Sequence, residues 1–556
     1  MRKISGNRYL AEALRSYGVD YFFHMPALLM PAFAEMHGMG ITLLSAHSEK
    51  AAAYMADGYS RVSNKVSVVG AQYVGAANLA AGLQDPWLGR SPVLAMTGGP
   101  ARGLRNKHVY QEIDALQMYD AVTKFNVSVE SVNRLPDLLR QAFRAATTGV
   151  PGPVHLEIPG HLADLDGEFT LDGGLPVSEA RFASFPAFRP EPDMVAVREA
   201  VELLKAARRP IIVAGGGVTA SGGERALQEF AELMKIPVAT SLNGKGAIPE
   251  RHELACGVVG TYPRMSANHT VNEADVVFFA GAQAGSQVTN MWKSPVPGAT
   301  KVIQLNIDPA ELGRNYPNDV SLLGDARTTL QRMIEVAEPV GGRDEWLGRA
   351  KQLADDWRRD NEPRMSSGAT PIRPERLVRE IENTLPDDGI FVVDTGHAGM
   401  WAAAMFDIKP GQKFLRAAGS LGWGYPASLG AKCAAPDRPV VCFTGDGGFY
   451  YHLSELETAL RYGINTVTVV NNNHSHNQEY GSMNRAYKGN QTPDAIRMWQ
   501  FDKRVNFADI AKGFGCEGIR VEDPGDVADA LKHALSLDKP VVVDVLTDIK
   551  AMADRP

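Results

Sequence analysis

The sequence has few cysteines, no long apolar run and no strong excess of one charge. Its four cysteines include no CxxC pair, so neither a zinc site nor a disulfide framework is predicted, and a reducing cytoplasm is the compartment that fits best. No run of about 18 apolar residues occurs, which predicts no membrane span, and the basic start lacks the apolar core of a signal peptide. The 57 Lys and Arg against 64 Asp and Glu give a net charge of −7, so no nucleic-acid partner is expected.

What the sequence does contain is a regular alternation of short Val/Ile-rich runs with helical patterns. The 556 residues are enough for three or four domains, and 44% hydrophobic with 22% charged residues is typical of a globular protein. Because the runs are continuous rather than alternating, they indicate parallel strands buried on both faces, and hence an α/β fold of doubly wound sheets. The runs are 41–46, 66–71, 92–97, 153–158, 210–215, 237–241, 274–281, 301–308, 389–394, 439–444, 466–471 and 540–546.

Two segments have the composition of linkers. Residues 173–192 are rich in Pro, Ser and Phe, and the stretch around 363–374 combines serines with prolines. Cutting at these segments predicts three domains, at residues 1–180, 190–345 and 370–556. The first and third look alike in architecture although not in sequence.

The strongest local signal lies in residues 440–473, which indicate a strand, a glycine-rich turn, a helix, a second strand and an asparagine run. Asp446 closes the first strand and Asn473 the next, and parallel strands joined by a crossover helix end at the same edge of a sheet. Gly447 and Gly448 would leave main-chain N–H groups open to a phosphate, and hard oxygen ligands suit Mg²⁺ shared with a diphosphate. The plainer alternative is a strand-end turn followed by a polar loop.

With its GDG turn and following NN pair, this stretch resembles the thiamine diphosphate (ThDP) enzymes, specifically the acetolactate synthase, pyruvate oxidase and decarboxylase superfamily. The resemblance implies a pyrimidine-binding, a middle and a diphosphate-binding domain. It also implies that Mg²⁺ is bound by Asp446, Asn473 and the main-chain carbonyl of Ser475. The diphosphate-binding residues implied in this way are Gly445, Asp446, Gly447, Gly448 and Asn473.

Two further stretches resemble parts of the same superfamily. Glu49 occupies the glutamate position that activates the cofactor through its pyrimidine N1′, although a first-turn glutamate is also favoured by the helix dipole. In residues 416–432, the Gly419 carbonyl would accept a hydrogen bond from the 4′-amino group and Leu421 would separate the two rings; ordinary core packing is the alternative. In this superfamily Glu49 and the diphosphate site come from different subunits, which implies a homodimer or homotetramer.

The substrate side carries a weaker signal. Gln111 stands where acetolactate synthases have the glutamine of a Phe–Gln–Glu triplet, and its amide would face the reacting carbonyl. His24 departs from the glycine-rich loop of those synthases and, as a residue that titrates near neutrality, would relay protons. A surface glutamine and a satisfied structural histidine are the alternatives. These polar residues predict a substrate pocket that is more polar than a pyruvate-only site. Such a pocket would suit a 2-oxo acid, a ketone or an aldehyde.

The middle domain carries a glycine turn, Gly215 to Gly217, directly after a predicted strand. This turn either binds FAD, as the equivalent domain does in acetolactate synthase and pyruvate oxidase, or is a vestigial fold element. A lone glycine triplet is weak evidence. Gln283 stands near the place where the synthases have an arginine, which counts against tight flavin binding.

Together these features predict a ThDP- and Mg²⁺-dependent lyase or transferase that cleaves or forms a C–C bond beside a carbonyl, by 2-oxo acid decarboxylation with carboligation. The alternative within enzymes is a non-ligating decarboxylase or C–C hydrolase that acts on a polar oxo acid or diketone. A catalytically silent relative is the alternative outside enzymes. A Rossmann dehydrogenase would need a strand–GxGxxG–helix unit, and the sequence offers no convincing one.

Overall fold

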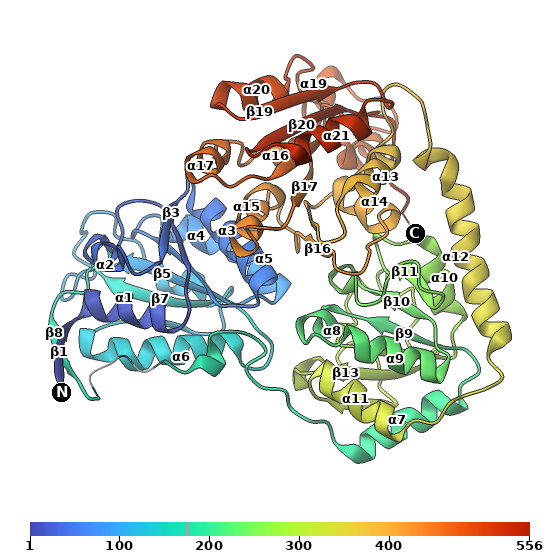
Figure 1. The fold of residues 1–556 in the computed structure, drawn as a ribbon, viewed down its shortest axis with the longest axis horizontal. Helices are drawn as coiled ribbons and strands as arrows, with labels where there is room; N and C mark the ends of the chain where they lie inside the picture. Colours follow the sequence, from blue (N-terminus) through green and yellow to red (C-terminus); the bar gives the residue numbers. More distant parts are fainter. Residues whose placement is uncertain (174–175, 177, 556) are drawn as a thin grey trace.

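The computed structural model describes residues 1–173, 176 and 178–555, and these fold around three parallel six-stranded sheets (Figure 1). The predicted α/β class is therefore confirmed. Each of the twelve Val/Ile-rich runs contains most or all of one strand. Residues 174, 175 and 177 of the expected linker 173–192 lie outside the described part.

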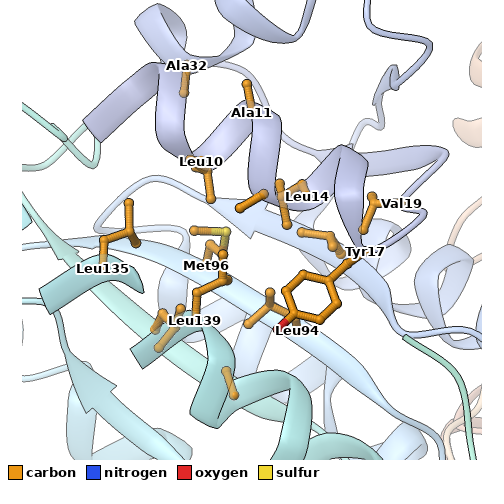
Figure 2. Close-up of a cluster of buried hydrophobic side chains, with 14 of the residues drawn as sticks. Leu10, Ala11, Leu14, Tyr17, Val19, Ala32, Leu94, Met96, Leu135 and Leu139 are labelled. Carbon is orange, nitrogen blue, oxygen red and sulfur yellow. The ribbon is translucent and has the colours of Figure 1, made fainter. Parts of the chain in front are cut away.

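The N-terminal sheet is covered by helices on both faces. Helices α1 (Gly6–Ser16), α2 (Met30–Met36) and α6 (Leu135–Thr147) pack on one face, where Leu10, Leu14 and Leu139 meet Leu94 and Met96 of the sheet (Figure 2). Helices α3 (Glu49–Ser63) and α4 (Ala76–Gly82) cover the other. The strands, in spatial order, are β3 (Thr42–Ser45), β2 (Tyr21–His24), β4 (Ser67–Ala71), β5 (Val93–Gly99), β7 (Val154–Pro159) and β6 (Asn126–Ser128). A separate antiparallel pair joins β1 (Arg2–Ser5) to β8 (Glu168–Leu171).

The central sheet has a different strand order, in which the direction of winding reverses between its third and fourth strands. In spatial order its strands are β11 (Ala255–Val258), β10 (Val238–Thr240), β9 (Pro210–Ala214), β12 (Val276–Ala280), β13 (Lys301–Asn306) and β14 (Val320–Leu323). Its covering helices are α7 (Met194–Ala206), α9 (Glu224–Met234), α10 (Met265–Glu273), α11 (Ala326–Val336) and α12 (Asp344–Met365). Figure 1 shows α12 running from this domain toward the C-terminal domain.

The C-terminal sheet repeats the strand order of the N-terminal sheet. Its strands are β16 (Lys413–Arg416), β15 (Ile390–Val393), β17 (Val440–Gly445), β18 (Val467–Asn472), β20 (Val541–Leu546) and β19 (Glu517–Val521). Its covering helices include α13 (Pro374–Thr384), α14 (His397–Met405), α15 (Gly424–Ala434), α17 (Glu455–Tyr462), α20 (Phe507–Phe514) and α21 (Val527–Ser536). The winding reverses between β15 and β17, and ligands of open α/β sheets bind at the carboxyl ends of strands at such a point.

The outer domains are joined by a close crossing of α3 and α15. A Cβ atom on Gly58 of α3 would lie 2.1 Å from the main-chain oxygen of Ala427, and one on Gly430 of α15 would lie 1.8 Å from that of Met55. Glycine is therefore required on both helices, because each backbone occupies the space of the other's side chain. The crossing packs α3 of the N-terminal domain directly against α15 of the C-terminal domain.

A buried histidine in the N-terminal domain makes stability depend on pH. The His155 ring lies 2.7 Å from Asn126 Oδ1 and 2.8 Å from Thr97 Oγ1, and burial lowers its pKa from 6.5 to about 3. Below pH 6.5 His155 therefore binds a proton in the unfolded chain but not in the folded chain. The folded state keeps its full stability above pH 6.5 and loses stability as the pH falls from 6.5 toward 3. We expect the free energy of unfolding to fall by up to about 1.4 kcal/mol per pH unit from this group.

Urea unfolding of the wild type and of His155→Gln at several pH values between about 4 and 7 measures this contribution. The variant should show a shallower dependence on pH. Equal slopes for the two proteins would show that His155 does not carry the effect.

Candidate active site

The carboxyl ends of β17 and β18 bring the predicted metal-binding residues together. Gly445 pairs with Asn471 across these strands, so Asp446 and Asn473 leave the sheet at the same edge. The Asp446 carboxylate accepts a hydrogen bond of 3.0 Å from the Ser475 amide, and the Ser475 hydroxyl donates one of 2.8 Å to Asn473 Oδ1. A carboxylate, a side-chain amide and a serine hydroxyl thus gather within one short segment of the edge.

The environment of Asp446 is that of a buried charge. The residue is 2% exposed, and burial raises the pKa of its carboxyl to about 7, against the lowering effect of hydrogen bonds from the Gly447 and Ser475 amides. A cation beside the carboxylate would favour its ionised form. No group of three or more His, Cys, Asp and Glu side chains suited to a metal exists in the described chain.

The glycine-rich turn differs from the expectation in two respects. The helix after it is divided into a short α16 (Asp446–Phe449) and the separate α17, and the Gly447 amide is engaged with Asp446 Oδ1 at 2.8 Å rather than left open. The need for glycine comes from neighbouring side chains: a Cβ on Gly447 would lie 2.5 Å from His476 Nδ1, and one on Gly448 2.8 Å from Asp394 Oδ2. A Cβ on Gly445 would meet no described atom within 4 Å, so space is open there.

Asp394, at the end of β15, is a residue of this edge that sequence reasoning missed. It is 1% exposed and accepts hydrogen bonds from the Gly422 amide at 3.1 Å and the Thr444 hydroxyl at 3.1 Å. Burial raises the pKa of its carboxyl to about 6. Asp394 therefore ties the end of β17 to the segment that precedes α15. Its position at the end of a predicted strand, on the same edge as Asp446, was the available signal.

Glu49 is the first residue of α3 in the N-terminal domain. Ser48 is the N-cap, and its side chain accepts a hydrogen bond from the Ala51 amide. The Glu49 carboxylate accepts a hydrogen bond of 3.3 Å from Asn78, and a Cβ on Gly75 would lie 2.5 Å from Glu49 Oε1. The carboxylate is half-buried and packs directly against the start of α4.

The start of α3 is also attached to the C-terminal domain. The His47 amide donates to the buried Glu455 carboxylate at 3.0 Å, and the His47 ring lies 2.7 Å from Glu457. Both acids belong to α17, which follows the glycine turn. The helix that carries Glu49 is thus fixed to the C-terminal domain just before its N-cap.

The remaining predicted residues lie in two loops and at one strand end. In the segment between β16 and α15, Gly419 is exposed and Leu421 half-buried. His24 ends β2 and is buried against Phe33, with its Nδ1 3.0 Å from the Met25 carbonyl, and burial lowers its pKa from 6.5. Gln111 adopts a left-handed backbone (φ 65°), and its amide oxygen is buried without a partner in the described residues.

These residues therefore form two groups. Hydrogen bonds join the C-terminal set around Asp446, whereas within the described chain no hydrogen bond connects that set to Glu49, Gln111 or His24. A left-handed backbone at a non-glycine residue such as Gln111 is uncommon, and such positions cluster at active sites. The His24 ring is buried, and burial lowers its pKa from 6.5.

A cavity of about 550 Å³ lies where the three domains meet. The glycine turns after β9 and β12, at the point where the central sheet reverses its winding, form part of its wall. Cationic side chains outnumber acidic ones around it, and those that line it include Arg61, Arg90, Arg189, Arg327, Lys413 and Arg416. Its size is that of a ligand pocket, and its charge favours an anionic ligand.

Comparison with known proteins decides the family. Residues 4–118, 197–333 and 394–545 match the models described as the N-terminal TPP binding domain, the central domain and the C-terminal TPP binding domain of thiamine pyrophosphate enzymes. A probable acetolactate synthase large subunit of Methanococcus aeolicus is 33% identical over 98% of this chain and 92% of its own length. This chain belongs to the thiamine pyrophosphate enzymes.

Other relatives place this thiamine pyrophosphate enzyme in the acetolactate synthase-like group. A probable acetolactate synthase large subunit of Methanocaldococcus jannaschii is 32% identical, and an acetolactate synthase large subunit of Lactococcus lactis subsp. lactis is 29% identical. Each alignment covers 98% of this chain and 92% of the relative. The resemblance inferred from the GDG and NN motifs is confirmed. Among the described residues, no helix combines the length and apolar character needed to cross a bilayer.

Proposed function

We propose that this enzyme uses ThDP and Mg²⁺ to decarboxylate a 2-oxo acid and to join the product to a second carbonyl compound. The observation that carries the proposal is the cluster of Asp446, Asn473 and Ser475 at the edge where the C-terminal sheet reverses its winding. The relatives named acetolactate synthase support the reaction class.

The oxygen atoms at this edge fit Mg²⁺ bound together with a diphosphate. Asp446 and Asn473 would supply a carboxylate and an amide oxygen, and Ser475 its main-chain carbonyl. Mg²⁺ is commonly held by one or two carboxylates together with phosphate oxygens, so a single carboxylate suffices here. The open space at Gly445 is available for the phosphate groups.

Glu49 would act on the other end of the cofactor. Bound ThDP supplies the electron sink that makes C–C cleavage beside a carbonyl feasible. Glu49 would hold a proton at the pyrimidine N1′, with Asn78 orienting its carboxyl group. The Gly419 carbonyl and Leu421 would hold the two rings in their bent arrangement. We assign Glu49 and the Asp446 cluster to different subunits, which requires a homodimer or homotetramer. The proposed domains of each subunit are residues 1–180, 190–345 and 370–556.

For the substrate side we propose Gln111, whose side-chain NH₂ group would donate a hydrogen bond to the reacting carbonyl; its left-handed backbone (φ 65°) supports a special role for this position. His24 would relay protons to and from the substrate from its buried position at the end of β2. A 2-oxo acid donor with a 2-oxo acid or aldehyde acceptor is the substrate class proposed. A non-ligating decarboxylase or C–C hydrolase is the second candidate, favoured by the polar residue His24 where the synthases have a glycine-rich loop.

The cationic cavity among the three domains is the proposed site of FAD, with its diphosphate at the glycine turn Gly215 to Gly217. Purified enzyme should then absorb near the flavin bands in the visible region. A colourless protein that gains no flavin from an excess of FAD would reject this assignment. It would leave the ThDP proposal intact.

A product assay tests the proposed reaction. Enzyme supplied with ThDP and Mg²⁺ is incubated with pyruvate and larger 2-oxo acids, with and without an aldehyde acceptor, and products are identified by mass spectrometry. We expect loss of CO₂ with a carboligation product. Aldehyde alone would select the decarboxylase alternative. Tight ThDP binding with no product across the panel would favour a catalytically silent protein.

A further inference from the structure

The segment from Arg416 to Trp423, which is expected to hold the cofactor rings, is hydrogen-bonded to the N-terminal domain of the same chain. Asp85, in α5 (Gln84–Gly89), is fully buried. Its Oδ1 accepts a hydrogen bond from the Ala418 amide at 2.7 Å, and its Oδ2 accepts from the Gly419 and Ser420 amides at 3.2 and 2.9 Å. One carboxylate thus receives three consecutive main-chain N–H groups from another domain, the type of charge-assisted contact that fixes backbone geometry most strongly.

A second group of contacts holds both ends of the same segment. Arg61 of α3 donates to the Arg416 carbonyl at 2.8 Å and to Asp85 Oδ1 at 3.2 Å. Arg61 also forms a bidentate pair with Asp57, at 2.8 and 2.7 Å. Asp57 in turn accepts from the Trp423 indole N–H at 2.9 Å, and the Arg61 guanidinium lies over the Trp423 ring. The segment from Arg416 to Trp423 is therefore held at its start, its middle and its end.

The residues that hold this segment lie on a tightly packed part of the structure. Asp57 and Arg61 lie on α3 beside Gly58, where the main chains of α3 and α15 touch without room for a side chain. The segment's other neighbour is Asp394, which accepts the Gly422 and Gly424 amides from the C-terminal side. The position of Gly419 is thus set by two buried carboxylates, one from each domain.

We propose that Asp85 is a positioning residue that sets where the Gly419 carbonyl and the Leu421 side chain meet the cofactor. This inference rests on the proposed function, since it assumes that ThDP lies against this segment. Asp85 itself touches neither cofactor nor substrate. Its loss would leave three main-chain N–H groups and Arg61 without their shared acceptor, and the segment would relax from the geometry that activation requires.

The test measures cofactor activation, a step whose rate depends on how the cofactor is positioned. The exchange of the C2 proton of enzyme-bound ThDP for deuterium is followed by rapid quench and NMR, with the site saturated by ThDP and Mg²⁺. We expect Asp85→Asn to lower the exchange rate and kcat together by about 10- to 100-fold, as for small misplacements in other active sites. Trp423→Phe keeps the ring but loses the bond to Asp57, and should lower both rates by a smaller factor, about threefold to tenfold.

The matched control is Asp275→Asn, because Asp275 also accepts two main-chain N–H groups, from Arg208 and Arg209 at 2.9 Å each, at the start of β12 in the central domain. The control should exchange at the wild-type rate. Wild-type rates in folded Asp85→Asn would overturn the inference. If that variant does not fold, Trp423→Phe decides in the same way.

Failure of the proposed function gives a different result. In that case even the wild type would exchange the C2 proton no faster than free ThDP does. The inference about Asp85 would then fall with the function, whereas a fast wild type and an equally fast Asp85→Asn would remove the inference alone.

Discussion

Glu49→Gln should lower kcat by about 10²- to 10⁴-fold and leave the affinity for ThDP within a few-fold of the wild type, which is the range expected for loss of one positioned acid–base group. Glutamine keeps the size and the hydrogen bond from Asn78 but supplies no carboxylic proton to the pyrimidine N1′. Steady-state turnover with pyruvate and calorimetric titration with ThDP in the presence of Mg²⁺ give the two quantities.

The alternative for Glu49 is a first-turn acid that only stabilises α3 through the helix dipole, worth about 0.3–1 kcal/mol. Glu345 offers the control, because it is an exposed acid in the first turn of α12. Glu345→Gln should retain full activity. If Glu49→Gln turned over pyruvate as fast as this control, Glu49 would have no catalytic role.

Asp446→Ala should remove ThDP and Mg²⁺ binding, with an affinity for ThDP at least about 100-fold weaker. Substitutions of groups that merely orient metal ligands already cost about 10- to 100-fold in metal affinity, and here the ligand itself is lost. The substitution also removes a buried carboxyl whose pKa is raised by burial, but it leaves the Gly447 and Ser475 amides without their acceptor, so apo-protein stability should change by no more than about 1–3 kcal/mol. Calorimetry of ThDP binding in excess Mg²⁺ and thermal unfolding of the apo-protein separate the two effects.

Asp526→Ala provides the comparison, since Asp526 is an exposed acid that immediately precedes α21 in the same domain. This variant should bind ThDP like the wild type. An Asp446→Ala protein that bound ThDP within about threefold of it would contradict the assignment of the diphosphate edge.

Strands that lie inside the sheets were predictable from sequence because they are buried on both faces and read as continuous apolar runs. The strands that went unpredicted lie mainly at the sheet edges, as β6, β11, β14, β16 and β19 do. An edge strand such as β14 alternates buried and exposed residues, and β19 includes charged positions, so neither produces such a run. The interior strand β2 was not predicted for another reason, because its residues are mostly aromatic rather than Val or Ile.

The candidate site divides in a similar way. Asp446, Asn473 and Ser475 lie within about thirty residues and belong to neighbouring strands, so their meeting follows from the parallel crossover rule. Asp85 was not predicted, because the main-chain amides that it accepts lie more than 330 positions away. Asp394 was missed although its partners Gly422 and Gly424 are only 28 and 30 positions away, because main-chain amides leave no signature in the residue types. Gly447 was assigned to phosphate approach, whereas His476, which lies against it, already excludes a side chain there.

The central claim is that one ThDP molecule is bound by the Asp446 edge of one chain and activated by Glu49 of another. Chains carrying Glu49→Gln and Asp446→Ala, with different affinity tags, are co-expressed and doubly tagged dimers are purified. Such a dimer has one site with both substitutions and one with neither, so it should show about half of the wild-type activity although each parent is inactive. A hybrid as inactive as its parents would show that the two residues do not serve one cofactor across a subunit boundary.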